Sequence, residues 1–218
     1  MTKRDNSFKY KIGIDEAGRG PWLGSVVACA LCFNPKNMPS KNFLEKIDDS
    51  KKLSEKKREK LYKILIELSL GDEPRVFFGV GVVDNYIIDE INIKQANKEA
   101  MRRALIEILR KIPNEDIGSV VVDGNDNYKF DELEKDPIFI IGGDGKVIEI
   151  GAASIIAKVF RDKLMKTYSK LYPDFGIENH KGYGTKKHRE YLTGKNKITG
   201  IHRLSYKPVK KILESKAL

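Results

Sequence analysis

The chain has 218 residues, and its 41 lysines and arginines outnumber its 31 aspartates and glutamates, which gives a net charge of +10. Hydrophobic residues make up 40% of it, enough to bury a core, which excludes a wholly disordered chain. With only two cysteines, Cys29 and Cys32, a disulfide framework is also excluded, and both are expected in the core. The excess of positive charge makes nucleic acid the first partner to consider.

The order of the predicted elements indicates an α/β fold. Apolar segments rich in β-branched residues predict strands over residues 10–15, 25–33, 75–84, 119–123 and 138–141. Helical periodicity predicts helices over residues 54–70, 91–111 and 148–172, and short helical stretches after residue 174. Such an order suggests a mixed sheet that is covered by helices.

No linker rich in Gly, Ser or Pro divides the chain, so we expect a single domain. Residues 1–9 are expected to form a loose lead-in and residues 10–218 the domain, with a catalytic core over about 10–175 and a basic, substrate-binding part over about 176–218. From His180 to Lys211, ten lysines and arginines accompany one acid, Glu190. This stretch is either a solvated surface or a track for nucleic acid, and the concentration of charge favours the track.

Four acidic residues follow or end predicted strands. Asp15 and Glu16 end the first strand, Asp123 ends the fourth, and Asp144 lies in a Gly-Gly-Asp-Gly loop after the fifth. In open α/β sheets, sites form at the carboxyl ends of strands. We therefore expect the four carboxylates to lie close together.

Adjacent strand residues point to opposite faces, so we expect Glu16 to join Asp15 only if the strand breaks there. Gly18 and Gly20 can supply that break. Converging carboxylates repel one another and require divalent cations, for which hard oxygen ligands favour magnesium or manganese. Two such ions about 4 Å apart form a site for phosphodiester cleavage. Because any one of these acids can be a turn-former or a cap, the prediction rests on all four.

The second long helix carries a polar stripe. Ser154, Lys158 and Arg161 are three and four residues apart and share one helix face, with Asp162 at its margin. A stripe of this kind suits phosphate oxygens, although a plain solvated face is the alternative.

Six segments together resemble the ribonuclease HII family in order and spacing, from about residue 10 to 208. They are GIDEAGRGP (13–21), DSKKLS (49–54), DGN (123–125), AASIIAK with RD (152–158 and 161–162), HKGYGT (180–185) and HRLS (202–205). The resemblance implies a ribonuclease H-like fold, a five-stranded mixed sheet flanked by helices, with a helical C-terminal part. It also implies an endoribonuclease that cleaves RNA paired to DNA and nicks duplex DNA 5′ to an embedded ribonucleotide, leaving 3′-hydroxyl and 5′-phosphate ends.

By the same resemblance, Asp15, Glu16, Asp123 and Asp144 hold two Mg²⁺ or Mn²⁺ ions. The loop before Asp144 varies in length within the family, so Asp162 is a competing candidate for the fourth acid.

The resemblance further implies that the backbone of Gly18, Arg19 and Gly20 reads the 2′-hydroxyl, the group that separates RNA from DNA at a sugar. Tyr183 is expected to pack on the sugar of the following deoxynucleotide, although taken alone it could be an ordinary half-buried tyrosine. The other candidates for substrate binding are Lys51, Asn125, Ser154, Lys158, Arg161 and His180.

Two other functions compete with this interpretation. A nucleic-acid-binding module without chemistry explains the basic stretch but not four acids at strand ends. A junction resolvase of the same fold explains the acids but not the Gly-Arg-Gly turn and Tyr183. We expect a cytoplasmic protein outside the membrane, because the chain lacks a long apolar run and an apolar signal core. We also expect it to be a monomer. No clamp-binding motif is recognised at the C-terminus, which leaves a sliding-clamp partner open.

Overall fold

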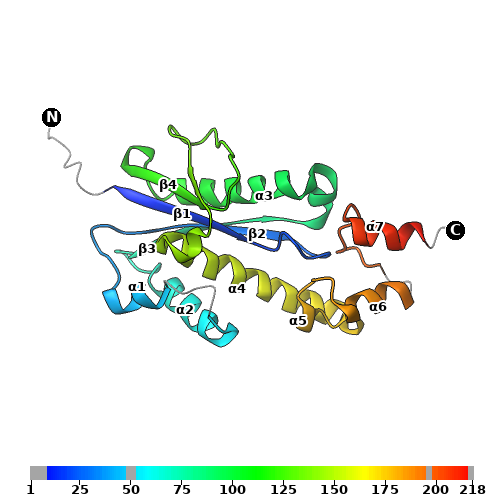
Figure 1. Cartoon of the computed structure of the whole chain (residues 1–218). Helices are drawn as coiled ribbons and strands as arrows, with labels where there is room; N and C mark the ends of the chain where they lie inside the picture. The colour runs from blue at the N-terminus through cyan, green and yellow to red at the C-terminus, as the bar shows by residue number, and fades with distance from the viewer. Residues whose placement is uncertain (1–8, 48–52, 195–197, 216–218) are drawn as a thin grey trace.

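The computed structural model describes residues 9–47, 53–194 and 198–215. Its five-stranded sheet has the order β3-β2-β1-β4-β5, and Figure 1 shows its strands between two layers of helices. The strands are β1 Tyr10–Ala17, β2 Val26–Phe33, β3 Val76–Val83, β4 Ile117–Asp123 and β5 Ile138–Ile140. β1 pairs antiparallel with β2 and parallel with β4, and β4 pairs parallel with β5. The expected mixed sheet is confirmed, and the carboxyl ends of β1, β4 and β5 lie at the same edge.

The helices are α1 Lys41–Ile47, α2 Glu55–Glu67, α3 Asn85–Leu109, α4 Ile148–Leu171, α5 Ile177–His180, α6 Lys186–Gly194 and α7 Lys207–Glu214. Short 3₁₀ turns are η2 Asn114–Asp116, η3 Gly143–Gly145 and η4 Pro173–Phe175. The expected helical C-terminal part corresponds to α5, α6 and α7. The sequence patterns did not indicate α1.

Two hydrophobic clusters hold the layers together. One joins α3 to the sheet face that carries Ile12 and Ile14, and the other joins α4, α1 and α2 to the opposite face. Cys29 and Cys32 are fully buried, one in each cluster, as expected for core cysteines. At Gly13 the sheet and α4 are so close that a β-carbon would lie 2.3 Å from the Glu149 backbone. This close approach brings α4 to the end of β1.

The first long helix begins earlier than predicted. α3 starts at Asn85, capped by Asp84, and is interrupted at Asn92, whose φ is +65°. The Asn92 side chain accepts hydrogen bonds from the amides of Lys94 and Gln95, as an N-cap does. The periodicity from residue 91 therefore identified the second of two joined helical segments.

Within the described ranges, no helix combines the length and apolar character that a membrane span requires. All of the predicted lead-in except Lys9 lies outside these ranges. The division of residues 10–218 into a core and a basic part stays a prediction.

Candidate active site

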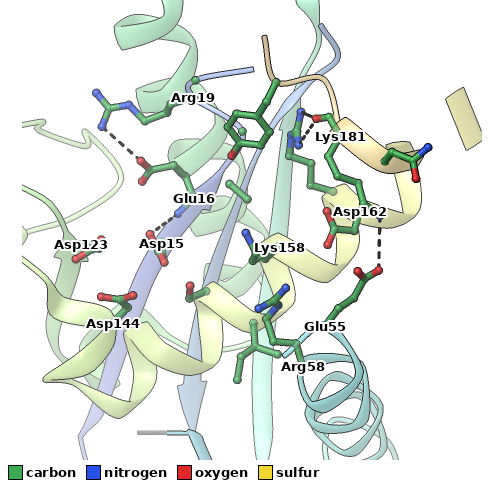
Figure 2. Close-up of a pocket in the computed structure, with 18 residues that line it drawn as sticks. Asp15, Glu16, Arg19, Glu55, Arg58, Asp123, Asp144, Lys158, Asp162 and Lys181 are labelled. Atoms are coloured by element: carbon green, nitrogen blue, oxygen red, sulfur yellow. Dashed lines mark hydrogen bonds and ion pairs between the residues drawn. The ribbon is translucent and has the colours of Figure 1, made fainter. Parts of the chain in front are cut away.

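A pocket of about 620 Å³ opens at the carboxyl ends of β1 and β4 (Figure 2). Twelve residues singled out from the sequence line it: Asp15, Glu16, Gly18, Arg19, Gly20, Asp123, Asp144, Ser154, Lys158, Arg161, Asp162 and Tyr183. These residues are far apart in the sequence, and the fold brings them to a single cavity.

The strand register positions three of the acids. Ile14 pairs with Val122 in the parallel β1–β4 ladder, so the next residues along, Asp15 and Asp123, lie beside each other. The chain leaves β5 through η3, where Asp144 is 4% exposed. The amide of Gly143 donates to Asp123 Oδ1 over 2.6 Å, which fixes this loop against the end of β4. In Figure 2, Asp15, Asp123 and Asp144 surround the same space.

Glu16 reaches the pocket without the break in β1 that the sequence analysis required at this point. The strand continues to Ala17, so Asp15 and Glu16 emerge on opposite faces. Asp15 shares a hydrogen bond with Ser154 of α4, whereas Glu16 Oε1 lies 3.4 Å from Arg19 Nη1. Both acids line the pocket because it opens at the end of the strand.

Burial makes the two adjacent acids unfavourable as anions. It raises the pKa of Asp15 well above its usual value, and the charge of Glu16 raises it further. Burial also raises the pKa of Glu16, although Arg19 opposes the shift. A divalent cation would offset this cost, and the carboxylate oxygens are the ligands that Mg²⁺ and Mn²⁺ favour.

The chemistry of the donor set therefore fits such a cation. Within the described part of the chain, no three His, Cys, Asp or Glu side chains already stand in an arrangement that could hold an ion.

Asp162, the competing fourth acid, also lines the pocket. Figure 2 shows it away from Asp15, Asp123 and Asp144, on the side where Glu55 and Lys181 lie. Lys181 Nζ and Glu55 Oε1 are 3.6 Å apart there.

The Gly-Arg-Gly turn and Tyr183 form an adjoining wall. Gly18 has a φ of +98°, and a β-carbon on it would lie 2.2 Å from Arg161 Nε, so only glycine fits. A β-carbon on Gly20 would lie 3.7 Å from Cε1 of Tyr183, whose side chain is 47% exposed. The turn and the ring thus border the same cavity as the acids.

Positive side chains line the rest of the pocket. Lys158 is exposed on α4, as the stripe predicted, and Ser154 lies one turn before it. Sequence reasoning missed Arg58 and Lys181. Lys181 belongs to the HKGYGT segment, which could have identified it, whereas Arg58 is one of many cations on α2.

Arg161 differs from the expectation that it binds phosphate. It is only 3% exposed, and Nε donates to the carbonyl of Ser25 while Nη1 and Nη2 donate to that of Lys181. Its donors are used to hold two backbone segments together.

His180 is buried and likewise supports the backbone, since Nδ1 accepts from the amide of Gly182 and Nε2 donates to the carbonyl of Phe175. Asn125 is exposed and is not among the residues that line the pocket. Lys51 lies outside the described residues.

Comparisons with known proteins identify the family of the chain. The family model described as ribonuclease HII matches residues 12–209. Ribonuclease HII from Fusobacterium nucleatum subsp. nucleatum is 46% identical over 211 residues, which cover 97% of this chain and 91% of the relative. Ribonuclease HII from Endomicrobium trichonymphae is also 46% identical, over 98% of this chain and 93% of its own.

Solved structures support the same relationship. The complex of PCNA and RNase HII from Archaeoglobus fulgidus matches with a TM-score of 0.68 at 26% identity, over 91% of this chain and 95% of the other. Ribonuclease H2 from Pyrococcus horikoshii OT3 matches with a TM-score of 0.68 at 28% identity, over 94% and 98%. Bst-RNase HIII in complex with Mn²⁺, at 16% identity and a TM-score of 0.74 over 97% of this chain and 71% of the other, shares the fold. With its pocket, its motifs and these relatives, the chain belongs to the ribonuclease HII family of hydrolytic endoribonucleases.

Proposed function

We propose that this enzyme hydrolyses the RNA strand of RNA–DNA hybrids and nicks duplex DNA on the 5′ side of an embedded ribonucleotide, leaving 3′-hydroxyl and 5′-phosphate ends. The observation that carries the proposal is that one pocket is lined both by the four acids expected to bind metal and by the Gly18–Gly20 turn with Tyr183. The acids that would bind the catalytic metal ions are therefore next to a surface that could recognise a sugar.

Asp15, Glu16, Asp123 and Asp144 would hold two Mg²⁺ or Mn²⁺ ions, which supply an activated water and stabilise the leaving oxygen when bound. The protein contributes the positions of the carboxylates. The parallel β1–β4 pairing places Asp15 by Asp123, and the Gly143 amide holds the Asp123 carboxylate. The position of Asp162 by Glu55 supports Asp144 as the fourth ligand.

The remaining residues of the pocket would orient the substrate. Backbone amides of the Gly18–Gly20 turn can donate to a 2′-hydroxyl, which a deoxyribose lacks. The half-exposed ring of Tyr183 beside Gly20 can pack on the next sugar, where a 2′-oxygen would crowd it. Lys158 and Ser154, which line the same pocket, would contact phosphates. The monomeric state and the cytoplasmic location stay predictions.

Cleavage of a long RNA–DNA hybrid by single-residue variants tests the proposal. Asp123→Asn and Asp144→Asn should each lose about a thousandfold or more in rate, because a neutral amide is a poor ligand for Mg²⁺. Asp162→Asn is the matched control and should stay within about threefold of the wild-type rate. A wild-type enzyme that cuts no hybrid with either metal would refute the function. If Asp162→Asn lost activity while Asp144→Asn stayed active, Asp162 would instead be the fourth metal ligand.

A further inference from the structure

Arg203 lies just before α7, is fully buried, and binds the inner side of the Gly18–Gly20 turn. Its Nη2 donates to the carbonyl of Gly18 over 2.7 Å, and its Nη1 donates to those of Arg19 over 3.1 Å and Pro21 over 2.9 Å. Its Nε donates to the carbonyl of Gly24 over 2.8 Å. One guanidinium therefore collects four carbonyl oxygens from seven consecutive residues, 18 to 24.

Tyr206 strengthens the same contact. Its hydroxyl accepts from Arg203 Nη1 over 2.7 Å and donates to the carbonyl of Arg19. The segment that carries Arg203 is itself fixed to α3, because Asp89 accepts from the amides of Leu204 and Ser205. Arg203 is thus fixed at its guanidinium by Tyr206 and at its backbone by the contacts of the next two residues with Asp89.

The carbonyl contacts determine where the amides of the turn point. In a trans peptide, the carbonyl and the N–H of the same unit point in opposite directions. Drawing the carbonyls of Gly18 and Arg19 inward therefore turns the N–H groups of Arg19 and Gly20 outward. Within the described ranges, neither N–H donates to another backbone group. Both residues line the pocket, whereas Arg203 does not.

The Pro21–Trp22 peptide has the same orientation, and its outward N–H group has an acceptor within the protein. The carbonyl of Pro21 faces Arg203, and the N–H of Trp22 in the same unit donates to the carbonyl of Gly182 over 2.8 Å. Gly182 directly precedes Tyr183. The arginine therefore also fixes the turn relative to the tyrosine segment.

We propose that Arg203 is a positioning residue for ribonucleotide recognition, which holds the Arg19 and Gly20 amides outward and preorganised for an oxygen of the ribonucleotide. The inference rests on the proposed function, because it assigns the turn a role in reading the sugar. Arginine suits this role because its planar fork can donate to several oxygens at once, whereas lysine is a point charge. Preorganised donors bind more tightly because little ordering remains to be done on binding.

Binding to two matched duplexes tests the role. One duplex contains a single ribonucleotide, the other is entirely DNA, and Asp123→Asn serves as the background so that neither is cut. Arg203→Lys should lower the preference for the ribonucleotide duplex about tenfold, the equivalent of about 1.4 kcal/mol, while its affinity for the DNA duplex stays unchanged. Tyr206→Phe, which removes both hydrogen bonds of the hydroxyl, to Arg203 Nη1 and to the Arg19 carbonyl, should lower the preference about two- to threefold. Arg75→Lys, which changes an exposed arginine that does not line the pocket and lies outside the basic part, is the control and should leave the preference unchanged.

The outcomes separate positioning from plain stabilisation. A purely structural arginine would lower the melting temperature and the active fraction but leave the preference of the folded protein intact, which would overturn the inference. If Arg203→Lys fails to fold, Tyr206→Phe decides between the two roles by the same ratio. If the background protein shows no preference for the ribonucleotide duplex, the proposed reading by the turn is wrong, and the role of Arg203 is wrong with it.

Discussion

Gly20 lies against Tyr183, close enough that a β-carbon on the glycine would be 3.7 Å from Cε1 of the ring. The turn expected to read the ribose and the ring expected to pack on the next sugar are therefore adjacent walls of one pocket.

Tyr183→Ala should reduce cleavage at an RNA–DNA junction by about a hundredfold, while long hybrids lose about tenfold or less. The ring has its largest effect where the following sugar is a deoxyribose, because a 2′-oxygen would crowd it. Rates on the two substrates provide the comparison. Tyr86→Ala, which removes a tyrosine that is 68% exposed on α3, is the control and should leave both rates unchanged. An equal loss on both substrates would contradict a sensing role for Tyr183.

Gly18→Ala should disrupt the turn. Its φ of +98° disfavours any β-carbon, and the added atom would collide with Arg161 Nε. We expect a loss of about 1–3 kcal/mol in stability and a lower affinity for the ribonucleotide duplex. Thermal unfolding and binding measure the two effects. Gly194→Ala, where a β-carbon meets nothing within 4 Å, is the matched control. Unchanged stability in Gly18→Ala would show that the turn can rearrange.

Asp15→Asn should abolish cleavage yet stabilise the fold in the absence of metal. The folded-state pKa of Asp15 is raised, chiefly by burial, so the native protein binds more protons than the unfolded chain just above the ordinary carboxyl range. Stability linked to this group therefore falls as the pH rises through that window, and a neutral amide avoids the loss. Melting temperatures of the variant and the wild type at pH 7 with EDTA test the sign. A lower melting temperature for the variant would contradict it.

The buried histidines should make the fold sensitive to acid. His188 Nε2 and His202 Nε2 are 3.1 Å apart, and His188 Nδ1 donates to the carbonyl of Tyr183. The amide of Thr199 donates to His202 Nδ1, so this ring carries its proton on Nε2 and donates it to His188. Both rings are therefore held neutral, each with a defined tautomer.

Burial lowers the pKa of His188 and of His202 to about 4, below the ordinary histidine value of 6.5. The unfolded chain binds more protons between these values, so stability is fully present above about pH 6.5 and is lost as the pH falls towards 4. Denaturation at pH 7 and pH 5 should show a steeper loss for wild type than for His188→Gln. Equal losses would exclude a contribution from His188.

The sequence predicted the features that depend on local pattern. The strands were recognisable because β-branched, apolar runs such as residues 26–33 favour a buried sheet. The acids were recognisable because they follow such runs. The predicted start of α3 was wrong because Asn92 divides the helix into two segments. A pattern of apolar residues cannot show that the first segment continues into the second.

Arg161 and Arg203 show where sequence reasoning failed at the site. Arg161 has the spacing of a phosphate ligand on α4, yet its guanidinium turns inward to carbonyls. Arg203 joins residues 184 and 185 positions away, at Arg19 and Gly18. Such contacts depend on how loops approach each other in three dimensions, and no local periodicity records them.

The most direct test of the account is the position of the cut in an end-labelled DNA duplex that contains one ribonucleotide, incubated with Mg²⁺, Mn²⁺ or EDTA. The account predicts a single nick on the 5′ side of the ribonucleotide, leaving a 3′-hydroxyl, with either metal and none with EDTA. A nick on the 3′ side, or cleavage that persists in EDTA, would contradict it.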